Sequence, residues 1–451
     1  MKVKNYNAWR YKYGYSSFIE NGNVDAFAFV DSKHATIQIR DPVIGNDIMV
    51  NRSKELTKPV RFYGIIDVYG QNIVSTEGDI WRRHKRAVAP VFGERNNALV
   101  HEVTVNLTQK MFESWEMKDK DEFLVNTLDD CENFALSVIS AAGFGINLEW
   151  DEKGDKANTH HRMTFRESMK KVIQYMPWYY AIPRSVLSLP VPAFSDAKVA
   201  RDEFGKYLDE MIDQAIDNPG LKASNILQAL AQASVLEKES HRLTKPEIKA
   251  DGFVMILAGH ETTANTLTFA LALLALHPEI QERLREACMK ELDGKMTPEY
   301  KDISKLHHSM AVMNETLRLF SQIFSHARET GETSAVVGKY VLPPHSIVEY
   351  NITSVHRDPE IWGKDEAEFK PERFFSLTEK MSLSWVPFAE GPRACVGKKF
   401  AQIEFVTLLT MISLRCKIRV PEGTSTDDLL SAKGLFTLKP ANPVKLLFSR
   451  R

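Results

Sequence analysis

The sequence predicts a mainly α-helical chain with small β-sheets and one long central helix. The run from Lys245 to Leu276 is apolar over most of its length and carries the start and stop signals of a single helix. Other helical stretches follow one another from Gly78 to about residue 217, whereas strand-like segments gather towards the two ends of the chain. No internal repeat, low-complexity tract or long Gly/Ser linker divides the sequence, so we expect residues 1–451 to form one compact domain.

The composition of the 451-residue chain excludes several classes of protein. The 58 basic and 59 acidic residues nearly cancel, so the bulk charge does not indicate a nucleic-acid partner. The cysteines lack the C-x-x-C spacing of zinc and redox sites and are too few for a disulfide framework, which favours a reducing compartment. They stand at Cys131, Cys288, Cys395 and Cys416.

The sequence contains neither a signal peptide nor a membrane span that we can identify. The first residues lack the apolar core of a signal peptide. The longest apolar stretch, Ala264 to Leu276, is shorter than the about 20 residues that a spanning helix needs. We therefore expect a chain that, as given, does not cross a membrane.

The N-terminal part changes character at Gly78. Residues 1–75 mix short strand-like runs with turns, and Ala35 to Ile39 alternates as a strand does. From Gly78 the pattern becomes helical and carries a basic run that ends at Pro90. A solvated face is the usual fate of such a run, and a docking face for an acidic partner is the alternative. The run comprises Arg82, Arg83, Lys85 and Arg86.

Further helices are predicted over residues 97–116, 123–142, 160–176 and about 196–217. The segment 176–192 contains several prolines and apolar aromatic residues, which make a poor helix. It is either a loop packed on the core or an exposed lip that dips into a membrane surface or gates a pocket.

The long helix has well-marked ends and an unusual middle. Thr244 and Glu247 form a capping box at its start, and the His-Pro pair at 277–278 ends it. Its length would be roughly 48 Å, enough to cross a domain. In the middle, Gly259 weakens the helix, and Thr262 or Thr263 can hydrogen-bond back to a carbonyl one turn earlier. Both effects favour an open place for a small ligand.

Glu261 introduces a charge into this otherwise apolar rod. An exposed polar turn would explain it. The apolar residues on both sides favour burial, and buried carboxylates and hydroxyls are more often functional.

The C-terminal third carries an E-x-x-R pattern on a helix predicted around 303–320. Residues at this spacing share a helix face and can pair. The pattern is weak evidence by itself, because the chain repeats it at Glu239/Arg242, Glu282/Arg285, Glu315/Arg318 and Glu390/Arg393. Strands and turns are predicted after this helix, with another helix from Lys398 to about Leu414 and strands at the end.

A glycine-rich loop surrounds Cys395. Gly391 and Gly397 let the backbone turn and approach a bulky partner, and Arg393 could meet an anionic group beside a thiolate-bound metal. A buried free cysteine in a tight turn is the simpler interpretation.

Taken together, these segments resemble the cytochrome P450 family, and most of all its eukaryotic, particularly fungal, members. The loop contains F-x-x-G-x-R-x-C-x-G as Phe388, Gly391, Arg393, Cys395 and Gly397. In the family's order there also stand A-G-x-E-T as Ala258, Gly259, Glu261 and Thr262, E-x-x-R as Glu315 and Arg318, and P-E-R-F as Pro371 to Phe374. The resemblance begins at about Trp9 and implies a single catalytic domain with a long helix over a haem.

The resemblance also implies how haem b, iron protoporphyrin IX, is held. Cys395 would be the axial thiolate of the haem iron and Phe388 would pack beside the sulfur. Arg393 and Arg328, the latter ten residues beyond Arg318, would meet the propionates. Glu315, Arg318 and Arg373 would form a buried structural network. The distal face would be lined by Ala258 and Gly259, and Thr262 and Glu261 would be the catalytic pair that handles dioxygen and protons.

The implied activity is that of a monooxygenase, which inserts one oxygen atom of O₂ into an apolar organic substrate. No G-x-G-x-x-G follows a predicted strand, so electrons must come from a separate NADPH-dependent cytochrome P450 reductase-type flavoprotein, with cytochrome b5 as a further donor. Lys398, Lys399 and the basic run after Gly78 would form its docking face. We expect a monomer at the surface of the endoplasmic reticulum membrane, touching it through 176–192, or otherwise a cytoplasmic protein.

The chain departs from the family pattern in several places. Trp81 matches the W-x-x-x-R motif, but Lys85 stands at the arginine position with Arg86 beside it, and Lys meets a propionate only as a point charge. Ser321 stands where a proline is usual. The N-terminal membrane helix of eukaryotic members is not seen, so the anchor is truncated or the protein is soluble or peripheral.

Two alternatives to a monooxygenase stay open. One is an isomerase, dehydratase or peroxygenase that needs no O₂, and the other is a haem protein without turnover. The substrate itself is not predicted. An apolar pocket is indicated by Phe253, Ile323, Phe324, Leu435 and Phe436, with polar contacts from Ser321, Gln322, Ser325 and His326.

Overall fold

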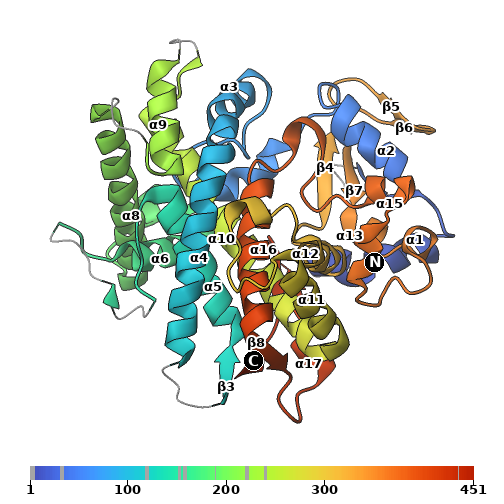
Figure 1. Ribbon diagram of the computed structural model, residues 1–451. Helices are drawn as coiled ribbons and strands as arrows, with labels where there is room; N and C mark the ends of the chain where they lie inside the picture. The colour runs from blue at the N-terminus through green and yellow to red at the C-terminus, as the bar shows by residue number, and fades with distance from the viewer. Residues whose placement is uncertain are drawn as a thin grey trace. The chain divides into compact units, whose positions relative to one another are not determined.

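The structure is a computed structural model that describes residues 6–30, 35–116, 121–150, 154–155, 160–187, 189–218, 223–237, 241–434 and 436–451. It confirms a mainly helical chain with small sheets, whose elements are labelled in Figure 1. The chain packs as two compact units. The first unit comprises Met1–Pro59, Trp115–Glu132 and Glu261–Arg451, and the second comprises Val60–Ser114 and Asn133–His260.

The first unit contains all of the strands found in the described residues. One mixed sheet has the order β1-β2-β7-β4, in which β2 and β7 are parallel and the other neighbours antiparallel. Its strands are β1 (Ala26–Val30), β2 (Ala35–Ile39), β7 (Ile347–Asn351) and β4 (Ser325–Glu329). A second, antiparallel sheet joins β3 (Glu122–Asn126), β11 (Lys445–Arg450) and β8 (Cys416–Arg419). Hairpins are formed by β5 (Ala335–Val337) with β6 (Tyr340–Leu342) and by β9 (Ala432–Gly434) with β10 (Leu438–Pro440).

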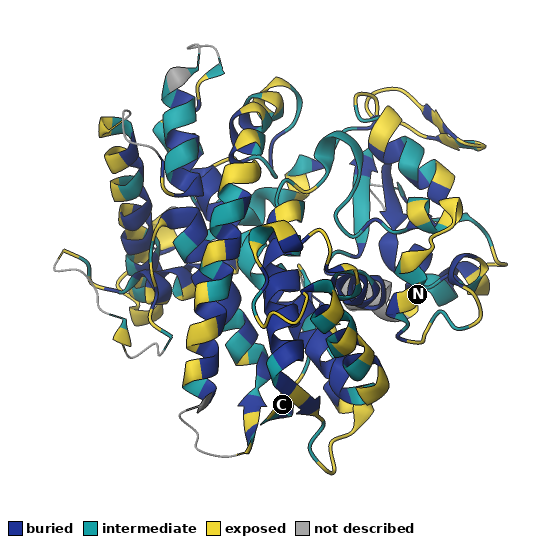
Figure 2. Cartoon of the chain, viewed as in Figure 1, coloured by how far each residue is buried: buried dark blue, intermediate teal, exposed yellow. Residues whose placement is uncertain are grey.

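The first unit also holds helices from both ends of the chain. They are α1 (Tyr6–Glu20), α2 (Pro42–Asn46), α11 (Pro278–Glu291), α12 (His307–Leu319), α13 (Ile352–His356), α14 (Pro359–Trp362), α15 (Glu379–Ser384), α16 (Lys398–Arg415) and α17 (Thr426–Leu429). A π-helical turn, Asp47–Asn51, follows α2. Of these helices, α16 is buried along most of its length, as the dark blue segment in Figure 2 shows.

In the described residues of the second unit, all of the regular secondary structure is helical. It contains α3 (Gly78–Val88), α6 (Phe165–Ala181), α7 (Arg184–Leu187), α8 (Pro192–Asp217) and α9 (Ile226–Leu236). Three helices have residues in both units, namely α4 (Glu94–Glu116), α5 (Thr127–Val138) and α10 (Lys245–Leu276). The aromatic rings of Tyr69, Phe204 and Phe253 pack on one another in the second unit.

The long helix α10 has the bounds that the sequence predicts, Lys245–Leu276. The capping box is present: the Thr244 backbone N–H donates to Glu247 at 2.8 Å, and the Glu247 N–H donates to the Thr244 hydroxyl at 3.4 Å. The helix is continuous through Gly259 and Thr262, so these residues do not interrupt it. Pro278 ends α10, as predicted, and is also the first residue of α11. The helix α11 was not predicted from the sequence.

The prediction that residues 1–75 hold only strands and turns is wrong for Tyr6–Glu20, which form α1. Aromatic residues, Gly and Ser are weak helix formers, so the local sequence gives little sign of it. Packing supplies what propensity lacks, because Phe18 is fully buried and its ring lies 4.6 Å from that of Phe27.

Two other predicted helices have different bounds. The first residues of the predicted helix 123–142 form β3, whose partner β11 lies at the far end of the chain and leaves no local signal. The predicted helix 160–176 begins at Phe165, after the cap residue Thr164, and continues through Pro177 to Ala181. Part of the predicted loop 176–192 is therefore helical. Residue 188 lies outside the described residues.

Candidate functional site

Cys395 lies in a turn between a short 3-10 helix, Gly391–Arg393, and the start of α16. Its backbone N–H donates to the carbonyl of Phe388, with an N···O distance of 2.8 Å. Cys395 is exposed, whereas the other cysteines are buried. A buried structural thiol is therefore the wrong interpretation of this residue.

The sulfur of Cys395 is open on one side and surrounded by protein on the other. The surrounding protein desolvates the thiol and raises its pKa, while the backbone N–H groups of Gly397 and Lys398 and the charge of Lys398 act in the opposite direction. The net effect is a raised pKa, and the backbone donors and the cation are the groups there that stabilise a thiolate.

Gly391 is required by the fold at this turn. Its φ of +73° disfavours any residue with a side chain, and a Cβ there would lie 2.6 Å from the carbonyl oxygen of Met49. The loop therefore presses its backbone onto the π-helical turn Asp47–Asn51. Gly397, by contrast, has an ordinary φ of −87°.

The residues before Cys395 form a packed platform. The rings of Trp385 and Phe388 are 6.2 Å apart, and the ammonium of Lys398 lies within 5.9 Å of both. The indole N–H of Trp385 donates to the carbonyl of Asn314 on α12, at 3.1 Å. The loop is thus attached to the helix that carries the predicted E-x-x-R pair.

Glu315, Arg318 and Arg373 lie together in a buried network. The Arg318 guanidinium donates twice to Glu315, at 2.7 and 2.9 Å, and both side chains are 0% exposed. Arg373 reaches the same carboxylate at 3.3 Å, and the backbone N–H of Lys370 donates to it at 2.9 Å. Among the repeated E-x-x-R patterns, this pair is buried, whereas Glu282 and Arg285 are both partly exposed.

Two histidines hold the backbone N–H and carbonyl of Val386. The backbone N–H of Val386 donates to Nε2 of His356 at 3.2 Å, and Nε2 of His326 donates to the Val386 carbonyl at 3.1 Å. Sequence reasoning missed His356 and assigned His326 to the substrate pocket. The available signal for His356 was its place directly before the residues Arg357, Asp358 and Pro359.

The middle of α10 is a strip of accessible surface within a buried helix. Residues on both sides of it are buried, whereas Ala258 is exposed and Gly259, Glu261 and Thr262 are partly exposed. The burial expected for Glu261 is therefore incomplete, with 27% of its side chain accessible. Lys439 on β10 places its ammonium 3.8 Å from the Glu261 carboxylate.

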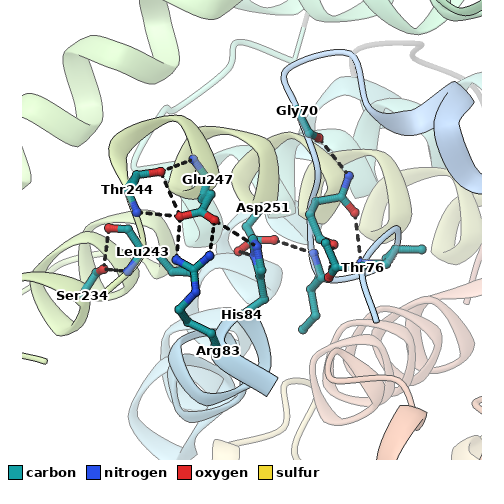
Figure 3. Close-up of polar contacts among 12 residues, drawn as sticks. Gly70, Thr76, Arg83, His84, Ser234, Leu243, Thr244, Glu247 and Asp251 are labelled. Carbon is teal, nitrogen blue, oxygen red and sulfur yellow. Dashed lines mark hydrogen bonds and ion pairs between the residues drawn. The ribbon is translucent and has the colours of Figure 1, made fainter. Parts of the chain in front are cut away.

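The basic helix α3 turns part of its charge inward. Arg83 donates to both carboxylate oxygens of Glu247 on α10, and Nδ1 of His84 lies 2.7 Å from Oδ2 of Asp251, as Figure 3 shows. Asp251 also accepts from the backbone N–H of Ile73 at 2.7 Å. Burial raises the pKa of Asp251 and hydrogen bonding to His84 lowers it, with a net rise.

His84 and Asp251 were not singled out from the sequence. The detectable signal was Asp251 itself, a charge in an apolar stretch of α10. On the outer side of α3, Lys85 lies 5.1 Å from the ring of Trp81, and Arg86 is exposed.

The remaining predicted residues have the following surroundings. Arg393 is partly exposed in the 3-10 turn, and Arg328 is buried on β4 with Nη1 donating to the Ala327 carbonyl at 2.9 Å. Phe324 packs under the β9–β10 hairpin, where a Cβ on Gly434 would lie 2.3 Å from its ring. Leu435 lies outside the described residues.

Each unit thus carries its own part of the predicted set. The first unit contains Cys395, Phe388, Arg393, Arg328, Glu261, Thr262, Glu315, Arg318 and Arg373. The second contains Trp81, Lys85, Arg86, Ala258 and Gly259. Within the first unit, hydrogen bonds connect the buried ion pairs to the Cys395 loop through α12 and His356.

Comparison with known proteins identifies the family. The sequence profile described as "Cytochrome P450" matches residues 25–448. "Cytochrome P450 monooxygenase 124" of Postia placenta is 31% identical, with 100% of this chain and 95% of that protein covered. "Cytochrome P450 3A11" of Mus musculus is 26% identical, over 98% of this chain and 88% of the relative. A crystal structure titled as the cytochrome P450DA heme domain has a TM-score of 0.78 at 21% identity, covering 100% of this chain and 97% of that one.

The residues around Cys395 fit the haem that this family binds. An exposed sulfur that receives backbone N–H groups has the chemistry of an axial thiolate. The Gly391 backbone is held against Met49, so the loop has one defined position on the first unit. The profile match over residues 25–448 and the 31% identity across the whole chain show that this protein belongs to the cytochrome P450 family and is a haem-dependent monooxygenase.

Proposed function

We propose that this monooxygenase inserts one oxygen atom of O₂ into an apolar organic substrate, using electrons from a separate NADPH-dependent flavoprotein reductase. The observation that carries the proposal is the exposed Cys395 thiol, which receives backbone N–H groups at the start of α16. We further propose that residues 1–451 work as one catalytic domain. The family profile supports this, because its match over 25–448 includes segments of both units.

Cys395 would hold the haem iron, with Phe388 packed beside the sulfur. Arg393, Arg328, Trp81 and Lys85 would bind the propionates, and Arg86 offers a second cation next to Lys85. Arg328 is buried, which strengthens its attraction for a carboxylate because solvent screens the charge less. The Lys85 ammonium lies over the Trp81 ring, so these two residues would act together.

Gly391 fixes the proximal loop by its close approach to Met49, and Gly397 allows close packing beside the sulfur. On the distal side, Ala258 and Gly259 would leave room for the porphyrin and small ligands. Their accessible surface in the middle of a buried helix supports this assignment.

Thr262 and Glu261 would manage protons during turnover. The haem supplies the oxidising chemistry when bound. The Thr262 hydroxyl would donate and accept hydrogen bonds at the place where dioxygen is reduced, and Glu261 would pass protons to it from solvent. The partial exposure of Glu261 and the nearby ammonium of Lys439 fit a carboxylate that stays in contact with water.

The electron donor would dock on exposed or partly exposed cations. Lys399 is exposed and Lys398 is partly exposed at the start of α16, next to the Cys395 loop, and Arg86 is exposed on α3. The Lys398 ammonium also lies 3.9 Å from the Glu390 carboxylate. Arg83 pairs with Glu247, so we do not count it among the docking cations. Arg82 is partly neutralised by Asp79, at 2.5 Å. An acidic flavoprotein would be attracted to the remaining charges, with cytochrome b5 as a second donor of the same sign.

The membrane contact would lie on the segment 176–192. Tyr180, Val186, Leu189 and Val191 are large apolar side chains that stay exposed there. None of the helices in the described part of the chain is long and apolar enough to cross a membrane. We propose peripheral attachment of a monomer at the endoplasmic reticulum surface.

The test of the proposed function uses the purified, haem-loaded protein. Its reduced carbon-monoxide complex should show the long-wavelength absorption of a thiolate ligand, and Cys395→Ala should lose it while Cys416→Ala, at a buried cysteine, keeps it. With a reductase and isotope-labelled O₂, a product from an apolar compound library should gain one labelled oxygen atom. Survival of the thiolate absorption in Cys395→Ala would overturn the ligand assignment.

A further inference from the structure

The Val386 backbone is held by two imidazoles, one on each of the peptide groups that flank its Cα. His356 accepts the Val386 N–H, and His326 donates to the Val386 carbonyl. The same carbonyl also accepts the N–H of Ala389, at 3.1 Å, which closes the turn before Cys395. Ala389 has a φ of +56°, a conformation that residues with side chains rarely adopt unless their surroundings enforce it.

Further hydrogen bonds connect the backbone around Val386 with Cys395 in one direction and with the buried ion pairs in the other. The turn presents the carbonyl of Phe388, which accepts the Cys395 N–H at 2.8 Å. In the other direction, Nη1 of Arg318 donates to the backbone carbonyl of His356 at 2.8 Å. A short path of hydrogen bonds therefore connects the Glu315–Arg318 pair with the Cys395 loop.

The two imidazoles must have opposite tautomers. His356 accepts through Nε2, so its proton is on Nδ1, whereas His326 donates through Nε2. Both side chains are neutral under ordinary conditions, because burial lowers the pKa of His326 to about 4 and of His356 to about 3. The nearby charges reinforce this: Arg318 faces His356, and Arg328 and Lys58 face His326.

We propose that His326 and His356 are positioning residues that fix the Cys395 loop in the geometry of a metal ligand by clamping the backbone of Val386. The proposal rests on the proposed role of Cys395 as the haem thiolate. Its physical basis is that each of the two peptide groups flanking the Val386 Cα has a hydrogen bond to an imidazole, so the backbone cannot rotate there without leaving buried polar atoms unsatisfied. Val386 is 2% exposed, so water does not readily replace either imidazole.

The first test is hydrogen exchange of the full-length protein, with variants that remove or retain each hydrogen bond. Leu at either position removes it, whereas Gln can place an amide oxygen or nitrogen at the position of Nε2. We expect exchange in segment 385–395 to become about ten- to hundredfold faster in His356→Leu and His326→Leu and to stay near wild type in the two Gln variants. Val348→Ala, in the buried apolar core of the sheet, is the control for general destabilisation.

The second readout is the haem spectrum. The Leu variants should convert a larger fraction of the reduced carbon-monoxide complex to the form without thiolate ligation, and the Gln variants should not. Unchanged exchange and unchanged ligation in His326→Leu would overturn the proposal, even if His356→Leu failed to fold. The proposal would also be overturned if hydrogen exchange in segment 385–395 became as fast in Val348→Ala as in the Leu variants.

A pH series tests whether the two imidazoles are neutral in the folded protein. Between pH about 6.5 and 4 the unfolded chain binds more protons at these histidines than the folded one, so the free energy of unfolding should decrease as pH falls. The decrease should be smaller in the Gln variants, which do not titrate. If the unfolding free energy depended on pH equally in wild type and in the Gln variants, the two imidazoles would not be neutral in the folded protein. Failure of Cys395→Ala to lose thiolate ligation would instead count against the proposed function and leave the exchange result standing.

Discussion

Arg83 binds both carboxylate oxygens of Glu247, at distances of 2.8 and 2.5 Å, and so connects α3 with α10. The pair is only partly exposed, with 24% of the Arg83 side chain and 21% of the Glu247 side chain accessible. The same carboxylate caps α10 through Thr244. One residue of a basic run that looked like a surface patch is therefore part of the internal structure of the second unit.

Replacing Arg83 should affect stability more than electron transfer. In Arg83→Ala, Glu247 loses two charge-assisted hydrogen bonds, and we expect a loss of about 1–3 kcal/mol in the free energy of unfolding. The exposed Arg86→Ala should leave stability nearly unchanged and weaken reduction by the flavoprotein at low salt. Urea unfolding and stopped-flow reduction measure the two effects, and a salt-dependent reduction defect in Arg83→Ala alone would contradict the assignment.

The Arg83–Glu247 pair should also make stability depend on acid pH. Burial alone would raise the pKa of Glu247, but hydrogen bonds from Arg83 and Thr244 lower it to about 2. Its contribution is therefore complete above pH about 4.5 and decreases as pH falls towards 2. The difference in unfolding free energy between wild type and Arg83→Ala should shrink over this range. A difference that is constant with pH would show that the pair does not hold Glu247 ionised.

Gly391 should tolerate no side chain. Gly391→Ala places a Cβ against the Met49 carbonyl in addition to the backbone strain. The strain by itself costs about 1–3 kcal/mol, so we expect a larger loss than this in the free energy of unfolding, together with weaker haem retention. Gly423 has a similar φ of +77° but nothing within 4 Å, so Gly423→Ala reports the backbone term alone. Equal losses in thermal unfolding would rule out the close approach as the reason for glycine.

Breaking the buried network should be costly. Glu315→Gln leaves the buried Arg318 without its countercharge, whereas Arg373 keeps its ion pair with Asp365 at 3.0 Å, and we expect destabilisation of about 3–5 kcal/mol, measured by urea unfolding. Glu282→Gln has the same spacing to Arg285 on a partly exposed surface and should cost about 1 kcal/mol or less. Similar costs for both would mean that burial does not distinguish the two pairs.

Thr262 should control how electrons are used. In Thr262→Ala the hydroxyl that handles dioxygen is lost, so peroxide release should rise relative to product, whereas Thr262→Ser keeps a hydroxyl and should stay close to wild type. The ratio of peroxide to product at matched NADPH consumption measures this. An unchanged ratio in Thr262→Ala would remove Thr262 from the proton-handling role.

Much of the fold could be predicted because its signals are local. The bounds of α10 follow from a capping box and a His-Pro pair, and α16 follows directly from the loop of Cys395. By contrast, β3 depends on pairing with β11 at the other end of the chain, and α1 depends on the burial of Phe18. Neither leaves a mark within a window of neighbouring residues.

The sequence by itself determined the family, the Cys395 motif and the residues that are candidates for each role. Only the tertiary structure decided which of the E-x-x-R patterns is buried, that Arg83 points inward, and that His326 and His356 meet at Val386. The reason is physical: residue order fixes periodicity, caps and turns, whereas the strength of a charge or hydrogen bond depends on the desolvation produced by residues far away in the chain.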